Sequence, residues 1–195
     1  SNAVAAAGFD GPFRPIYRLD KDTSGLVVLA RHQLSAAKLA GKVQKDYYAV
    51  VPGTYAGSGT VDAPIAHCPD STVKRQVDPA GVRAVTHWET LGQQGGRTLL
   101  RVQLETGRTH QIRVHMASLG HPVAGDPVYG PARPKLGLEG QALHAARLTL
   151  AHPRTGETMT FAAPVPAYFC KALLRAGRPA GEDIEAFLCR QWGEA

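Results

Sequence analysis

Runs of residues typical of β-strands outnumber helical stretches in this 195-residue chain, and their order restricts the folds open to it. The strand-like runs lie at 26–30, 47–51, 98–104, 143–150 and 159–162. The stretches with helical spacing of apolar residues lie at 34–43, 109–119, 168–175 and 184–192. Because strands and helices do not alternate regularly, the pattern favours an α+β fold over a doubly wound parallel sheet.

Three of these segments carry specific expectations. The run 26–30 is apolar, so we expect a buried strand there. Residues 98–104 alternate apolar with polar side chains over most of their length, which is typical of a half-buried strand. Thr109 is expected to cap the helix that follows it, and the expected apolar face of that helix carries Ile112, Met116 and Leu119.

Length and charge point to one globular domain with a basic surface. Residues 1–3 resemble a remnant of tag removal, and 4–195 are expected to form a single domain. Lys and Arg number 22 against 16 Asp and Glu, which leaves a net charge of +6. A basic balance suits a polyanion such as RNA, but it equally fits a basic surface that binds no nucleic acid.

The cysteines favour a reducing compartment. Cys68, Cys170 and Cys189 are far apart and form no Cys-x-x-Cys pair, which argues against a disulfide framework and a cysteine zinc site. No apolar run approaches the roughly 20 residues that a bilayer span needs. We therefore expect a cytoplasmic protein without a membrane segment, and we expect a monomer.

Two segments concentrate residues that can do chemistry. In Tyr17-Arg18-Leu19-Asp20-Lys21-Asp22-Thr23-Ser24-Gly25, a carboxylate stands where a short extended run meets a turn. Taken alone, Asp20 fits an ordinary turn-forming aspartate. The second segment, Thr106-Gly107-Arg108-Thr109-His110-Gln111-Ile112-Arg113-Val114-His115, holds two Arg and two His.

Together these segments resemble the RluA-like pseudouridine synthases, RNA-modifying enzymes that isomerise uridine. The family's first motif reads His-Arg-Leu-Asp-x-x-Thr-Ser-Gly, so the resemblance makes Asp20 the catalytic residue, with Tyr17 in place of the His. Residues 43–53 resemble the second motif, which implies that Tyr47 is the active-site tyrosine. Residues 106–115 resemble the third motif, whose Arg pairs with the catalytic Asp and is Arg113 here.

Further stretches extend the resemblance to roughly residues 14–170. Gly120-His121-Pro122 with Gly125-Asp126-Pro127-Val128-Tyr129-Gly130 matches one of them, and 143–145 with 152–156 matches a C-terminal hairpin. The implied fold is a central mixed, mostly antiparallel sheet with flanking helices and a basic active-site cleft. The implied enzyme needs no cofactor and no metal. Family catalytic domains usually begin with a further strand, which this chain is expected to lack, and no S4 domain is visible.

Several basic residues are candidates for contact with ribosomal or transfer RNA. If the run before Asp20 is extended, Arg18 shares its face and can fill the space that a flipped nucleotide leaves. Lys21, Lys45, Arg108 and His110 are further candidates, with Lys74 and Arg75 as diffuse backbone contacts. Tyr48 points to the strand face opposite Tyr47 and is expected to pack in the core.

Two other readings stay open. Asp20-x-Asp22-x-Ser24 superficially echoes the nucleophile loop of haloacid dehalogenase phosphatases, although Arg18 interrupts the approach and no Asp-Asp pair follows. A Mg²⁺-dependent phosphatase assay separates that class. The other alternative is a non-catalytic RNA-binding module on the same fold, which would bind RNA and leave uridine unchanged.

Overall fold

The computed structural model describes residues 11–94, 96–131, 138 and 140–166 of the chain. The helices expected at 168–175 and 184–192 lie outside the described residues. Neither of the two helices in the described part has the length and apolar character that a membrane span requires.

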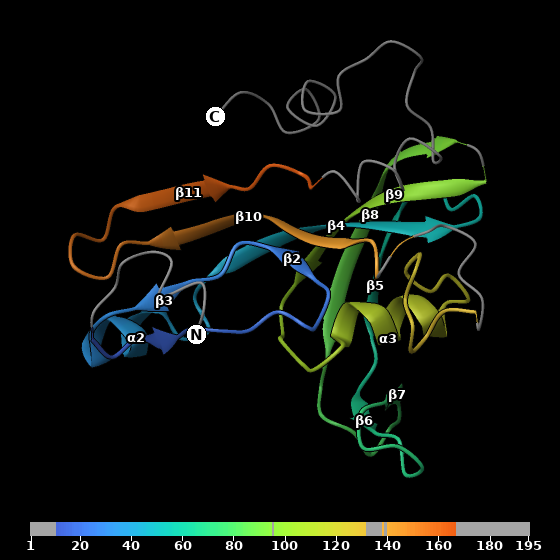
Figure 1. Ribbon diagram of the computed structural model, residues 1–195, viewed down its shortest axis with the longest axis horizontal. Helices are drawn as coiled ribbons and strands as arrows, with labels where there is room; N and C mark the ends of the chain where they lie inside the picture. The colour runs from blue at the N-terminus through green and yellow to red at the C-terminus, as the bar shows by residue number, and fades with distance from the viewer. Residues whose placement is uncertain (1–10, 95, 132–137, 139, 167–195) are drawn as a thin grey trace.

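A seven-stranded sheet forms the centre of the protein (Figure 1). Six of its strands follow the order β11-β10-β4-β9-β8-β5, and every pairing along this path is antiparallel. Their bounds are Gln44–Pro52 for β4, Ser58–Asp62 for β5, Val85–Gln94 for β8, Arg97–Leu104 for β9, Leu143–Ala151 for β10 and Thr158–Ala162 for β11. The seventh strand, β2 (Ser24–Gly25), pairs with β10 in parallel. The sheet is therefore mixed and mostly antiparallel, as expected.

Smaller elements flank this sheet. Strand β1 (Arg14–Pro15) pairs with β3 (Leu29–Ala30) beside helix α2 (Gln33–Leu39). Strands β6 (Ile65–His67) and β7 (Arg75–Val77) form a separate hairpin, which projects past helix α3 (Gln111–Ser118) in Figure 1. Helix α2 is shorter than the expected 34–43, and Gly41 at a φ of 71° follows its end.

Helix α3 packs on one face of β4 and β9. Ile112 and Met116 join a cluster with Tyr47, Leu100 and Val102, in which every side chain is buried. Burial of one such side chain contributes about 1.5–3 kcal/mol. Strand β9 confirms the expected alternation from Leu100 onward. This cluster fixes α3, and with it Arg113, against the centre of the sheet.

The start of α3 differs from the expectation that Thr109 caps it. The N-cap is His110, which adopts a left-handed conformation with a φ of 59°, and no side chain caps the helix. Instead, the Gln111 side-chain oxygen accepts a hydrogen bond from the Arg108 backbone N–H at 2.9 Å. Leu119, expected on the apolar face, is 39% exposed because the helix ends before it.

The expectation of a buried strand at 26–30 was also wrong. Only Leu29 and Ala30 form a strand, and Val27 and Leu29 are 44% and 38% exposed. The run is divided between two partners: the Leu26 N–H donates to Ala145 O in β10, whereas β3 pairs with β1. A continuous apolar run therefore does not form a single strand here.

Candidate active site

A cavity of about 270 Å³ opens between the segment 16–23, strand β4 and the start of α3. The sequence-predicted residues Asp20, Tyr47, Arg18, Lys45 and Arg108 line it together with Gln111 and Ile112. Residues from three separate parts of the chain thus meet at one place.

Asp20 stands at the first position of a tight turn. The Thr23 backbone N–H donates to Asp20 O at 3.1 Å, and Asp22 inside the turn has a φ of 65°. The Asp20 side chain is 20% exposed, and Arg113 Nη1 donates to its Oδ2 at 3.4 Å. The Asp20–Arg113 pairing expected from the sequence is therefore present, with a carboxylate that remains accessible from the cavity.

Arg113 is held mainly by a second carboxylate. Its Nε and Nη2 donate to Asp126 Oδ2 and Oδ1 at 2.7 and 2.9 Å, and both side chains are buried. The backbone N–H groups of Val128 and Tyr129 also donate to Asp126 Oδ1, at 2.8 and 3.0 Å. Sequence reasoning assigned no role to Asp126, although it lies in the Gly-Asp-Pro stretch that carried part of the resemblance.

The charges of this pair stabilise each other. Burial alone lowers the pKa of Arg113, but hydrogen bonds and charge from Asp126, with the charge of Asp20, raise it above the ordinary value. Burial likewise raises the pKa of Asp126, and the hydrogen bonds from Arg113, Tyr129 and Val128 more than offset this and lower it. The guanidinium is therefore a permanent cation beside Asp20.

Tyr47 lies on the cavity side of β4. It pairs with Val102 in β9 and is only 6% exposed. Burial, followed by the neighbouring Tyr17 and Asp20, raises the pKa of Tyr47, so the phenol keeps its proton at neutral pH. Tyr48 is buried on the opposite face of the strand, as expected of a packing residue.

Lys45 reaches the cavity over an aromatic ring. Its Nζ lies 4.3 Å from the centroid of the Tyr17 ring, and the Tyr17 hydroxyl donates to Leu26 O at 2.9 Å. Burial lowers the pKa of Lys45 and raises the pKa of Tyr17 to about 12. Tyr17, which departs from the family motif, therefore supplies a cation–π support for Lys45.

The other basic candidates are spread around the cavity. Arg18 and Arg108 are exposed at its edge, where Arg18 donates to Thr109 Oγ1 at 3.3 Å and Arg108 Nε donates to Arg83 O at 3.0 Å. The segment that carries Arg18 is irregular, so a strand face does not explain why Arg18 and Asp20 meet. Lys21 is exposed and does not line the cavity.

His110 does not line the cavity. Its Nδ1 and the Tyr129 hydroxyl share a hydrogen bond of 2.9 Å. Burial, and then the charge of Arg113, lower the pKa of His110, so its ring is neutral at pH 7. The same Tyr129 hydroxyl accepts a hydrogen bond from the Arg75 backbone N–H at 2.8 Å, which ties the β6–β7 hairpin to the start of α3.

No cluster of three or more His, Cys, Asp or Glu side chains suited to a metal ion occurs within the described ranges. The polar side chains of the cavity are one carboxylate, two phenols, a hydroxyl, an amide and several cations.

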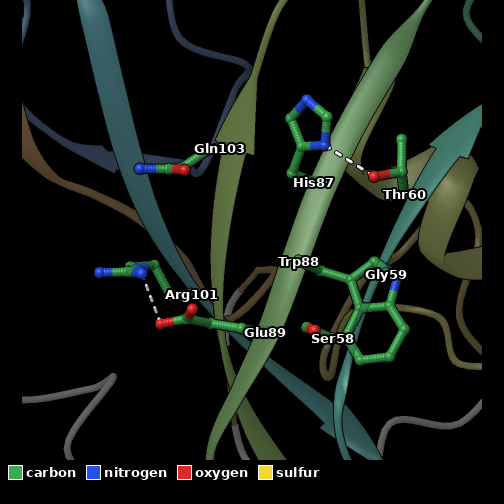
Figure 2. Close-up of a pocket in the computed structure, with 8 residues that line it drawn as sticks. All are labelled: Ser58, Gly59, Thr60, His87, Trp88, Glu89, Arg101 and Gln103. Carbon is green, nitrogen blue, oxygen red and sulfur yellow. Dashed lines mark hydrogen bonds and ion pairs between the residues drawn. The ribbon is translucent and has the colours of Figure 1, made fainter.

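A second hollow, of about 260 Å³, lies on strands β5, β8 and β9 (Figure 2). Its polar side chains include His87, Glu89, Arg101 and Gln103. Arg101 and Gln103 alternate with Val102 along β9, and they pair with Glu89 and His87 in β8. Because Val102 pairs with Tyr47, all four side chains face away from Tyr47. Arg101 Nη2 lies 2.7 Å from Glu89 Oε1, so the two charges offset each other. This hollow contains none of the sequence-predicted residues.

Comparison with known proteins gives a consistent result. A family profile described as RNA pseudouridylate synthase matches residues 4–118. The chain is 50% identical over 164 residues to an uncharacterized RNA pseudouridine synthase of Chloroflexus aurantiacus, covering 80% of this chain and 52% of that protein. It is 44% identical over 168 residues to ribosomal large subunit pseudouridine synthase D of Escherichia coli, covering 77% and 52%. The chain thus spans about half the length of these curated relatives.

Solved structures show the same fold. Human RNA Pseudouridylate Synthase Domain Containing 1 superposes with a TM-score of 0.72 at 23% identity, covering 94% of this chain and 81% of that one. Human RNA Pseudouridylate Synthase Domain Containing 4 gives a TM-score of 0.68 at 26% identity, covering 89% and 79%. The expected architecture is confirmed by these similarities.

Proposed function

Because this chain belongs to the RNA pseudouridylate synthase family, we propose that it isomerises uridine to pseudouridine in RNA. The observation that carries the proposal is one cavity, edged by basic side chains, which Asp20 and Tyr47 line and at which Arg113 contacts Asp20. Asp20 and Arg113 come from segments 93 residues apart, so their contact is a property of the folded protein.

The reaction must break the N1–C1′ bond, turn the uracil and form a C5–C1′ bond, after which C5 loses a proton and N1 gains one. We assign the first step to Asp20, as a nucleophile or as a base on the sugar. Arg113 keeps this carboxylate ionised and oriented, because Asp126 holds the guanidinium from the other side. No step requires a metal ion or an organic cofactor.

Tyr47 has a different part in this scheme. Its raised pKa leaves little phenolate at neutral pH, which favours stacking on the uracil ring over accepting the C5 proton. A flipped uracil enters the cavity beside Tyr47, and the exposed guanidinium groups of Arg18 and Arg108 contact the phosphates next to it.

The substrate proposed for the first test is large-subunit ribosomal RNA. The basis is the 44% identity to ribosomal large subunit pseudouridine synthase D of Escherichia coli, and transfer RNA is the alternative. The monomeric state and the cytoplasmic location expected from the sequence stay predictions.

The experiment compares two Asp→Asn variants on RNA from a strain that lacks the gene. Asp20→Asn removes the reacting carboxylate, whereas Asp46→Asn changes a carboxylate whose Oδ1 is bonded to Gln103 on the opposite sheet face. We expect wild type and Asp46→Asn to form pseudouridine at the same sites in excess EDTA, and Asp20→Asn to form none.

Two results would contradict the proposal. Wild-type protein that binds RNA and leaves every uridine unchanged is a non-catalytic RNA-binding module. Product formation by Asp20→Asn at the wild-type rate removes the carboxylate from the reaction. A short unstructured RNA serves as a second substrate, so that EDTA cannot act through the folding of the RNA itself.

A further inference from the structure

A buried side-chain amide, that of Gln141, is bonded to the turn that carries Asp20. Gln141 is completely buried, and its Nε2 donates to Lys21 O at 2.6 Å and to Thr23 Oγ1 at 2.8 Å. These two acceptors flank Asp22, whose positive φ is uncommon for a residue with a side chain. Gln141 thus bonds to the residue on either side of Asp22, which has the unusual conformation.

The backbone around this amide leaves no room for adjustment. A Cβ atom on Gly140 would lie 2.5 Å from Asp22 Cβ, so the two segments touch at a position where only glycine fits. On the other side of the turn, Gly25 has a φ of 112°, and a Cβ there would lie 2.2 Å from Ala145 O. The segment 140–145 therefore contacts the Asp20 turn at Asp22 and the strand that follows the turn at Gly25.

The same segment is joined to the loop that holds Arg113. The Ala142 backbone N–H donates to Ala124 O at 2.7 Å, and a Cβ on Gly125 would lie 2.5 Å from Gly140 O. Asp126, the partner of Arg113, follows directly in that loop. The segments 124–126 and 140–145 are therefore joined, and together we call them the frame. The frame positions the Asp20 turn through Gln141 and the Arg113 guanidinium through Asp126.

This frame matters because the contact between Asp20 and Arg113 is long. At 3.4 Å it is near the limit of a hydrogen bond, so a small displacement of the turn removes it. Gln141 also leaves its buried Oε1 without a hydrogen-bond partner among the described residues. Burial of an unpaired amide oxygen destabilises a fold, so stability alone does not account for a glutamine at this position.

We propose that Gln141 is a positioning residue for the reaction, which acts by holding the Asp20 turn at the distance that Arg113 requires. The inference rests on the proposed function. A hydrogen-bond donor is needed at this position of the side chain, because Nε2 faces the carbonyl oxygen of Lys21 and the hydroxyl oxygen of Thr23, and both accept from it. A carboxylate of the same shape would place negative charge against Lys21 O instead.

The test uses Gln141→Met, which keeps the length and removes both donors, and Gln141→Glu, which keeps the shape and replaces the donor by an acceptor. Gln103→Met is the matched control, because Gln103 is an exposed amide on the opposite sheet face. The rate and KM on RNA are measured together with hydrogen exchange of the Thr23 amide, which is bonded to Asp20 O. Both are measured well below the melting temperature of each variant.

We expect kcat to fall by about 10- to 100-fold in both Gln141 variants with KM within about 2-fold of wild type, since misplacement of a reacting group acts on the chemical step. The Thr23 amide should exchange faster in both, and Gln103→Met should match wild type in rate and exchange. Unchanged kcat in the two variants would overturn the proposal. A rise of KM by the same factor as the fall of kcat would overturn it too. Loss of folding in both would make Gln141 a structural residue and equally overturn it.

The two proposals fail in different ways. If wild-type protein forms no pseudouridine in any RNA, the proposed function is wrong, and Thr23 exchange still reports whether Gln141 holds the turn. If wild type is active and Gln141→Met is equally active, the function stands and the positioning role is wrong.

Discussion

Arg113 bridges two carboxylates of different character. Asp126 is buried and bonded to the guanidinium at two atoms, whereas Asp20 is partly exposed and contacts a third atom from the cavity side. Because a buried charge is costly without a partner, Asp126 offsets the burial of Arg113 and leaves Asp20 available for reaction. At the scale of single residues, a structural ion pair thus supports a reactive carboxylate.

Replacement of Asp126 by Asn should therefore affect stability and activity together. The variant leaves the buried Arg113 without its bidentate partner, and we expect the free energy of unfolding to fall by about 3–5 kcal/mol. Urea unfolding measures the change, and product formation should fall in parallel. Glu89→Gln is the comparison, because its pair with Arg101 is partly exposed and is worth about 0–1 kcal/mol. Equal stability losses in the two variants would contradict the buried role of Asp126.

The raised pKa of Tyr47 predicts how the stability of the protein changes at alkaline pH. The folded protein raises its pKa, so folded Tyr47 keeps its proton at a pH where the unfolded chain, with tyrosine near 10, has lost it. The unfolded state then binds fewer protons, and stability falls as the pH rises above about 10. We expect Tyr47→Phe to show a shallower fall between pH 9 and 11 in urea titrations. A parallel dependence in both proteins would mean that Tyr47 ionises normally.

At the scale of elements, α3 places Arg113 because the helix is buried almost all round. All residues from Gln111 to Met116 are buried, including the polar His115. His115 Nδ1 shares a hydrogen bond with Thr86 Oγ1 at 2.8 Å, and its Nε2 bonds to Ala63 O at 2.9 Å. The polar side chains of this helix thus find partners in the core, which its sequence pattern does not reveal.

Met116 in α3 and Leu119 just after it should differ sharply on truncation. Met116 is completely buried against the sheet, so Met116→Ala should lower the free energy of unfolding by about 2–5 kcal/mol. Leu119 follows the helix and is 39% exposed, so Leu119→Ala should change stability by no more than about 0.5 kcal/mol. Denaturant unfolding of both variants measures the difference. A large loss for Leu119→Ala would show that this side chain packs against more of the protein.

At the scale of the whole molecule, the net charge is +6, and the arginines of the two sheet faces differ in the groups to which they bond. In the hollow on β5, β8 and β9, Arg101 is paired with Glu89. At the cavity edge, Arg18 and Arg108 instead bond to a hydroxyl and a carbonyl, which are neutral groups. The cavity side is therefore the face on which we expect phosphate contacts.

RNA affinity should accordingly fall as salt rises, because phosphate contacts release counterions. Arg18→Ala and Arg108→Ala should each weaken binding and reduce the slope of log affinity against log salt by about 0.7–0.9. Lys38→Ala is the control, since Lys38 lies on α2 and bonds to Pro153 O, away from the cavity. Titration of labelled RNA at several salt concentrations provides the slopes, and equal slopes for the three variants would place the RNA elsewhere.

Two kinds of property could be predicted from the amino-acid sequence: those that depend on neighbouring residues and those that follow from the order of the motifs. The alternation in 98–104 predicts strand β9, because side chains of a strand alternate between faces. The ordered motifs predicted that Asp20, Tyr47 and Arg113 meet. In the structure Asp20 and Tyr47 line one cavity, and Arg113 contacts Asp20. Their catalytic roles stay predictions until the variants are assayed.

The groups that hold these three residues in place became visible only in the folded protein. Asp126 and Gln141 lie in turn-rich stretches without periodicity, and the hydrogen bonds that they make depend on the segments that fold against them. The apolar run 26–30 was misjudged for the same reason, because β10 and β1 divide it between them. A buried hydrogen bond or ion pair depends on distances across the fold, and local sequence patterns carry no information about those distances.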